Sequence, residues 1–213
     1  MDESTPKEKV LKKIRNALIN KKDNPYSGLD LESPIYVINE EDPLVLFANT
    51  FTDKGGKFLY CETADELMEN LATIAQDNQL EPLFCSDPAI REILRTAEIA
   101  SIADPSELPN LKASITRCEQ LVARTGSIVM SSKLHGGRNS YSMPDVHIVV
   151  GYASQVVREI KHALQEIKTR YSSPPSLVTF VTGPSRTGDI EKTLVMGAHG
   201  PKELYLLFID DRE

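Results

Sequence analysis

The amino-acid sequence predicts an α/β domain in which helices cover a largely parallel β-sheet, preceded by an N-terminal helical extension. Three observations support this fold class. Short apolar runs of strand length recur along the chain, helical periodicities lie between them, and capping or turn residues separate the two kinds of segment. We divide the chain into a helix and linker, residues 1–42, and a main domain, residues 43–213.

The extension begins with a helix-capping pattern. Thr5-Pro6-Lys7-Glu8 places a hydroxyl at the cap, proline at the first helical position and glutamate at the third. An apolar stripe follows at helical spacing, formed by Val10, Leu11, Ile14, Ala17 and Leu18. This stripe packs either on its own domain or, across the polar linker from Asn20 to Gly28, on another subunit.

From Pro43 onward, helical and strand patterns alternate along the chain. We expect helices over 43–52, after the capping residue Thr63, after Asp87-Pro88, and after the capping residue Ser154 with Val156, Val157 and Ile160 on its apolar face. We expect strands over 57–61, 82–85, 127–130, 146–150, 177–181 and 204–209. This alternation favours a largely parallel sheet.

Composition excludes several classes of function. Lys+Arg 24 against Asp+Glu 31 give a net charge of −7 and a pI of about 5.2, so we expect no nucleic-acid binding. Apolar runs are too short to span a bilayer and the N-terminus is charged, so we expect a cytoplasmic protein without a membrane partner. Cys61, Cys85 and Cys118 lie far apart, which argues against a disulfide framework or a metal-binding cysteine motif.

The segment between the last two predicted strands is the strongest candidate for a ligand site. It follows a predicted strand, and ligands of α/β folds gather beyond the carboxyl ends of strands. Its polar residues are Ser185, Arg186, Thr187, Asp189 and His199, with glycines at 183, 188, 197 and 200.

Two common catalytic motifs are excluded in this segment. Gly183 and Gly188 have the outer spacing of a P-loop, but Asp189 stands where that motif needs lysine. The nucleophile elbow G-x-S-x-G needs glycine at the position of Thr187. We therefore expect neither NTP hydrolysis nor serine-hydrolase chemistry here.

Binding of a carboxylate or phosphate is the remaining functional interpretation. Arg186 offers a bidentate contact, Ser185 and Thr187 offer hydroxyl donors, and glycines such as Gly183 and Gly200 let backbone approach a ligand. The alternative is structural, with Asp189 paired to Arg186 and the hydroxyls capping the next helix.

A second polar segment, residues 131–140, follows the predicted strand 127–130. Its Arg138 and the Arg186 segment could clamp one anion between them. A solvated hairpin or mobile loop is the alternative, because Gly136 and Gly137 suit it equally well.

The histidines predict no metal site, because His135, His147 and His199 share neither a helix face nor a tight turn. His199 is the one candidate for acid–base catalysis, since the turn formed with Gly197 and Gly200 could expose it. The competing interpretation is a neutral histidine that hydrogen-bonds the backbone of that turn.

These residues resemble a known family. The run Gly183-Pro184-Ser185-Arg186-Thr187-Gly188-Asp189-Ile190-Glu191, followed by Gly197-Ala198-His199-Gly200-Pro201, is similar to the signature of the LUD-domain family of lactate utilisation proteins. Thr125-Gly126-Ser127 and the segment 143–150 are similar to its two other characteristic segments, so Thr125 and Gly126 join the candidate ligand-binding residues. The resemblance covers most of the chain from about residue 43.

The resemblance implies a three-layer α/β sandwich of the NagB/RpiA/CoA-transferase type. It also implies a role with iron–sulfur partner proteins in oxidising L-lactate to pyruvate. Because this chain has no flavin fingerprint and no cysteine cluster, we expect no cofactor and a non-redox role. Two positions depart from the family pattern, where Arg124 replaces an acidic residue and Ser127 replaces threonine. The charge reversal at 124 puts the ligand in question, although it could add to an anion site.

Three functions follow from these patterns. The first is a non-redox subunit of a lactate-oxidising system that binds a small anion. The second is an independent enzyme acting on a phosphate-, carboxylate- or CoA-bearing substrate. The third is a binding or scaffold protein that docks through its N-terminal helix. The sequence leaves open whether the chain is an enzyme and whether it forms a homo-oligomer.

Overall fold

The computed structural model describes residues 5–19, 28, 40–190 and 193–212, and the chain divides into two units, Met1–Glu40 and Glu41–Glu213. The first unit contains α1 (Pro6–Ile19), which begins with the predicted capping box: Thr5 N donates to Glu8 Oε2 at 2.8 Å, and Glu8 N donates to Thr5 Oγ1 at 3.3 Å. No residue of α1 is buried, and its apolar stripe is exposed.

The second unit is built around a six-stranded sheet in which every neighbouring pair is parallel. This confirms the predicted α/β class with a parallel sheet. The strand order from edge to edge is β1 (Lys57–Cys61), β12 (Glu203–Ile209), β7 (Val146–Tyr152), β4 (Ala113–Arg117), β2 (Leu83–Phe84) and β3 (Ser101–Ile102).

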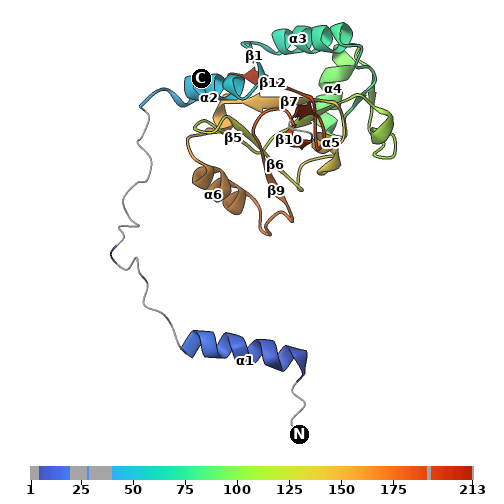
Figure 1. The fold of residues 1–213 in the computed structure, drawn as a ribbon. Helices are drawn as coiled ribbons and strands as arrows, with labels where there is room; N and C mark the ends of the chain where they lie inside the picture. The colour runs from blue at the N-terminus through green and yellow to red at the C-terminus, as the bar shows by residue number, and fades with distance from the viewer. Residues whose placement is uncertain (1–4, 20–27, 29–39, 191–192, 213) are drawn as a thin grey trace. The chain divides into compact units, whose positions relative to one another are not determined.

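Two helices cover one face of this sheet, α3 (Ala64–Asp77) and α4 (Pro88–Thr96) (Figure 1). Their first turns are capped as the sequence predicts, by Thr63 and by Asp87. Leu67, Leu71, Ile90 and Leu94 of the helices pack in one core with Ile115, Ile148 and Leu207 of the strands.

A second sheet covers much of the other face, together with α2 (Pro43–Asp53). Its order is β8 (Val156–Val157), β5 (Gln120–Val122), β6 (Ser127–Ser131) and β9 (Val178–Val181). Helix α6 (Ile160–Arg170) packs on this second sheet through Ala163 and Ile167 (Figure 1). The strands expected at 127–130 and 177–181 therefore belong to a mixed sheet, in which β6 is antiparallel to both neighbours, and not to the parallel one.

The helix expected after Ser154 begins later than predicted. Ser154 lies in the 3-10 helix η2 (Ala153–Gln155), and Val156 and Val157 pair with Leu121 and Val122 as strand β8. Helix α6 begins only at Ile160. The two valines satisfy a helical period, but pairing with β5 overrides that local preference.

The expected loop between residues 182 and 201 contains a β-hairpin. β10 (Arg186–Ile190) and β11 (Thr193–Met196) form an antiparallel pair with a register shift between Thr187 and Ile190. Two short helices complete the fold, η1 (Leu108–Asn110) and α5 (Asn139–Ser142).

Candidate functional site

Two of the family-like segments meet at the C-terminal end of α2. Ser127 Oγ donates to Thr125 Oγ1 at 2.7 Å and shares a 2.7 Å hydrogen bond with Thr182 Oγ1. Gly126 has φ +60° and lies so close to α2 that a Cβ atom there would be 2.6 Å from Phe51 N. The structure thus brings Thr125 and Gly126 next to the start of the 182–201 segment, as a site built from both would require.

Arg186 is tied to the same helix end. Its Nη2 donates to the carbonyl oxygen of Lys54 at 2.6 Å, and Gly183 also lies against that carbonyl. A Cβ atom on Gly55 would be 2.2 Å from Arg186 Nη2, so glycine is needed for this contact. The guanidinium therefore has a structural partner, although five N–H donors leave it capacity for others.

Ser185 organises the turn that carries His199. Ser185 N donates to the carbonyl of Pro201 at 2.8 Å, and Ser185 Oγ accepts from His199 N at 3.3 Å. His199 is exposed. A Cβ atom added to Gly200 would lie 3.4 Å from Ser185 Cβ, so the two residues pack closely. Thr187 is half-buried, whereas the side chain of Asp189 lies outside the described residues, so its expected pairing with Arg186 stays a prediction.

Arg138 and Arg124 are the other arginines that the sequence singles out. Arg138 is exposed at the N-cap position of α5, and no contact recorded among the described residues links it to Arg186. Arg124 Nε pairs with Glu159 Oε2 at 2.7 Å. The expected two-arginine clamp from 131–140 and 182–201 stays a prediction.

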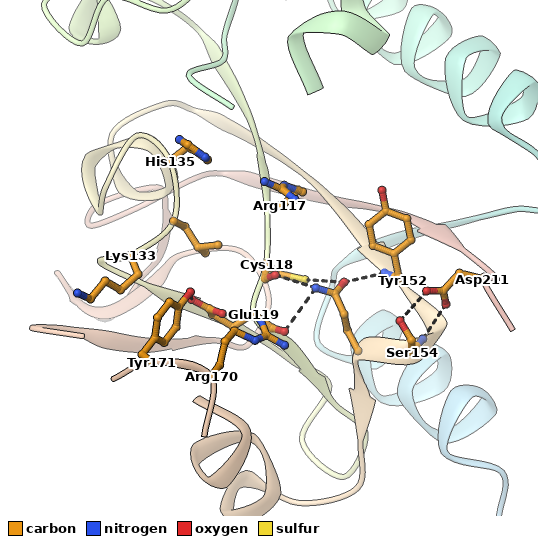
Figure 2. Close-up of a pocket in the computed structure, with 12 residues that line it drawn as sticks. Arg117, Cys118, Glu119, Lys133, His135, Tyr152, Ser154, Arg170, Tyr171 and Asp211 are labelled. Carbon is orange, nitrogen blue, oxygen red and sulfur yellow. Dashed lines mark hydrogen bonds and ion pairs between the residues drawn. The ribbon is translucent and has the colours of Figure 1, made fainter. Parts of the chain in front are cut away.

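A different set of residues surrounds a cavity of about 500 Å³ (Figure 2). It lies beyond the carboxyl ends of β4, β7 and β12, where parallel sheets bind ligands. Figure 2 shows basic groups on one side of it and Tyr152, Ser154 and Asp211 on the other. The lining residues are Arg117, Cys118, Glu119, Lys133, Leu134, His135, Tyr152, Ser154, Gln155, Arg170, Tyr171 and Asp211.

Arg117 of this cavity lies at the point where the strand order reverses. After β2 the chain adds β3 on one side, whereas β4, β7 and β12 follow on the other. The crevice between β2 and β4 is the usual ligand position of such a sheet. There Asp87, which is 4 % exposed, accepts from Arg117 Nε at 2.7 Å and Nη2 at 2.6 Å. This pair fixes the guanidinium, whose side chain is 41 % exposed.

Arg170 is held in the same way by Glu119, whose side chain is fully buried. Arg170 Nη1 donates to Glu119 Oε2 at 2.9 Å, and Tyr171 Oη donates to Glu119 Oε1 at 2.8 Å. Ser131 Oγ donates to the same carboxylate. Burial and the bond to Glu119 both raise the pKa of Tyr171, so the phenol keeps its proton and acts as a donor.

The far side of the cavity is neutral or acidic. Asp211 accepts from Ser154 N at 2.8 Å and from Ser154 Oγ at 2.5 Å. Burial alone would raise the pKa of Asp211, but these hydrogen bonds keep it below its usual value, so the group is a carboxylate. Burial raises the pKa of Tyr152, which therefore presents a protonated phenol.

Sequence reasoning missed most of this cavity because it missed β4. Ser114 and Thr116 interrupt the apolar pattern of that strand, yet both are buried: Ser114 Oγ donates to the carbonyl of Ser140, and Thr116 Oγ1 lies 2.8 Å from His147 Nε2. A strand ending at Arg117 would have marked Arg117, Cys118 and Glu119 as residues at a carboxyl edge.

Within the part of the chain that the structure describes, no three His, Cys, Asp or Glu side chains come together as a metal site. The three cysteines are free and buried. Burial raises the pKa of Cys85 to about 11 and that of Cys118 to about 12, so these thiols stay protonated. Over the same residues, no helix has the length and apolar character to cross a membrane.

The family model described as LUD domain matches residues 44–209. The chain is similar to an uncharacterised protein of Neisseria meningitidis serogroup B, with 26 % identity over 84 % of this chain and 72 % of that protein. It is also similar to lactate utilization protein C of Shouchella clausii, 31 % identical over 57 % of this chain and 51 % of that protein. The protein of the same name from Bacillus subtilis is 32 % identical over 46 % of this chain and 42 % of that protein.

The matched region thus spans about half the length of these lactate utilization proteins. Among solved structures, a DUF162 family protein from Deinococcus radiodurans superposes with a TM-score of 0.58 at 20 % identity. The match covers 78 % of this chain and 96 % of that one, and it shows a shared fold.

Proposed function

Because this chain belongs to the LUD domain family, we propose that it is a non-redox subunit of an L-lactate utilisation system, that it acts with iron–sulfur partner proteins in oxidising lactate to pyruvate, and that it binds a small anion. The observation that carries this proposal is the identity of about a third to lactate utilization protein C from several bacteria. A cytoplasmic location and the NagB/RpiA/CoA-transferase type of fold belong to the same proposal.

The side chains of this protein support a non-redox role. Converting lactate to pyruvate removes two electrons and two protons, which an acceptor must receive. Clusters that carry such electrons are held by cysteine thiolates. Here the three thiols are free and buried, no three metal-ligating side chains come together within the described residues, and burial raises the pKa of each thiol. The proposal therefore assigns electron transfer to the partner proteins and ligand binding or assembly to this chain.

A test of this function is growth on L-lactate as the carbon source. Deleting the gene in a host without a paralogue should abolish growth on L-lactate and leave growth on pyruvate unchanged, because only the oxidation step is removed. The wild-type gene supplied in trans should restore growth. Undiminished growth of the deletion strain on L-lactate would refute the role in lactate oxidation.

The second candidate function is an independent enzyme acting on a phosphate-, carboxylate- or CoA-bearing substrate. The cavity beyond the strand ends, with its three cationic side chains, favours this alternative. It requires turnover by the purified chain without partners. A screen of phosphosugars, carboxylates and CoA thioesters that shows no turnover would remove it.

A further inference from the structure

The geometry points to the cavity beyond β4, β7 and β12 as the anion site, and to an anionic organic ligand larger than lactate. This inference rests on the anion binding of the proposed function but not on the lactate pathway. Its anionic group, a phosphate or a carboxylate, would lie among Arg117, Lys133 and Arg170, which all line the cavity.

The two arginines are positioned as a binding site requires. Each is fixed by a carboxylate at least nine-tenths buried, Asp87 for Arg117 and Glu119 for Arg170, and each side chain remains more than 40 % exposed. The recorded bonds use Nε and Nη2 of Arg117 and Nη1 of Arg170. Since a guanidinium has five N–H donors, both keep donors for a ligand while their orientation is already set.

The buried acids Asp87 and Glu119 balance the charges of the two arginines, and Lys133 adds a third positive charge that neither acid balances. Its Nζ lies 3.4 Å from Ser173 Oγ, and no ion pair joins it to a carboxylate within the described parts of the chain. His135 lies on the same side of the cavity, and Tyr171 helps Glu119 to hold Arg170 there (Figure 2). A ligand in this cavity would gain charge-assisted hydrogen bonds from these cations, and its anionic group would gain one from Lys133.

The size and the far wall of the cavity define the rest of the ligand. Sites of about 300–1,000 Å³ enclose molecules of drug size, and the volume here is about 500 Å³, so lactate would leave much of it to water. The opposite wall presents the Tyr152 phenol and the Asp211 carboxylate. These groups suit hydroxyl groups on the distal part of the ligand.

Calorimetric titration of the full-length protein tests this site with four probes: 6-phosphogluconate, citrate, inorganic phosphate and L-lactate. We expect one of the two larger anions to bind at least about tenfold more tightly than L-lactate. A preference for 6-phosphogluconate would identify a phosphate group, and a preference for citrate would identify a carboxylate. Failure of both to bind, or binding of L-lactate with equal affinity, would overturn the inference.

The substitution Lys133→Gln tests whether the anion binds in this cavity, because this exposed lysine can be changed without leaving a buried charge. It should weaken binding of the preferred probe by about tenfold or more, the scale of one charge-assisted contact. Lys168→Gln, on the exposed surface of α6 and outside the cavity, is the matched control and should bind as the wild type does. Equal affinities of Lys133→Gln and the wild type would contradict the site. Probe binding combined with normal growth of the deletion strain would refute the lactate role alone.

Discussion

His147 is a fully buried imidazole in the middle of the parallel sheet. Its Nε2 lies 2.8 Å from Thr116 Oγ1, and its Nδ1 has no hydrogen-bond partner among the described residues. Burial lowers the pKa of His147 to about 3, so the folded protein holds the ring neutral at physiological pH. An interior position of this kind favours a structural role over a metal-ligating one.

This burial predicts a loss of stability on acidification. A histidine in the unfolded chain has a pKa of about 6.5, so between that pH and about 3 the unfolded state binds a proton that the folded state does not. The contribution of the neutral ring to the free energy of unfolding is complete above about pH 6.5. Below that pH, the free energy of unfolding should fall by up to about 1.4 kcal/mol per pH unit. Urea unfolding at about pH 7, 6 and 5 measures this slope.

Two variants separate His147 from other titrating groups. His147→Gln should be less stable at neutral pH but should show a flatter pH dependence, whereas His162→Gln, at a partly exposed position, should keep the wild-type slope. A wild-type protein with the same free energy of unfolding at pH 7 and pH 5 would contradict the expectation.

Arg186 can also be tested at the scale of one residue. The 2.6 Å bond from its Nη2 to the Lys54 carbonyl joins the hairpin to the end of α2, so Arg186→Ala should lower the free energy of unfolding by about 1–2 kcal/mol. Arg186→Lys, which retains a cation, should lose less. Unchanged stability together with a roughly tenfold loss of affinity for an anion would instead support the ligand contact inferred from the sequence.

At the scale of elements, α1 is a helix whose apolar stripe has no buried residue. Removing residues 1–24 should leave the melting temperature of the main domain within about 1–2 °C of the full chain, because the buried core clusters of that domain are built from its own residues. If the stripe docks onto a partner protein, the same truncation should abolish capture of that partner. A truncated chain that unfolds, or that still captures its partner, would exclude this role.

The elements that the sequence predicted correctly carry local signals. The caps at Thr63 and Asp87 and the apolar runs at 57–61 and 204–209 identify themselves through neighbouring residues. β4, β8 and the hairpin β10–β11 do not, since their strand conformation depends on partners far along the chain. The buried hydroxyls of β4 gave this segment the sequence pattern of a polar connection, although it is an interior strand of the parallel sheet.

At the scale of the whole molecule, the reversal of strand order between β2 and β4 organises the domain. It brings the loop after β2 beside the end of β4, where Asp87 orients Arg117, and the chain then returns to add β7 and β12. The 182–201 segment follows β9 of the second sheet, so its place after a strand did not put it at the carboxyl edge of the parallel sheet.

The sequence by itself determined the α/β class, the capped helices and the family, because these depend on periodicity, caps and a long motif within contiguous residues. Only the tertiary structure decided which strands entered which sheet and which side chains surround the cavity. Arg117, Lys133 and Arg170 come from a strand, a loop and a helix far apart in the chain. Their arrangement around one cavity depends on sheet order and on the buried acids that orient the arginines, and neither is encoded in residues adjacent to them.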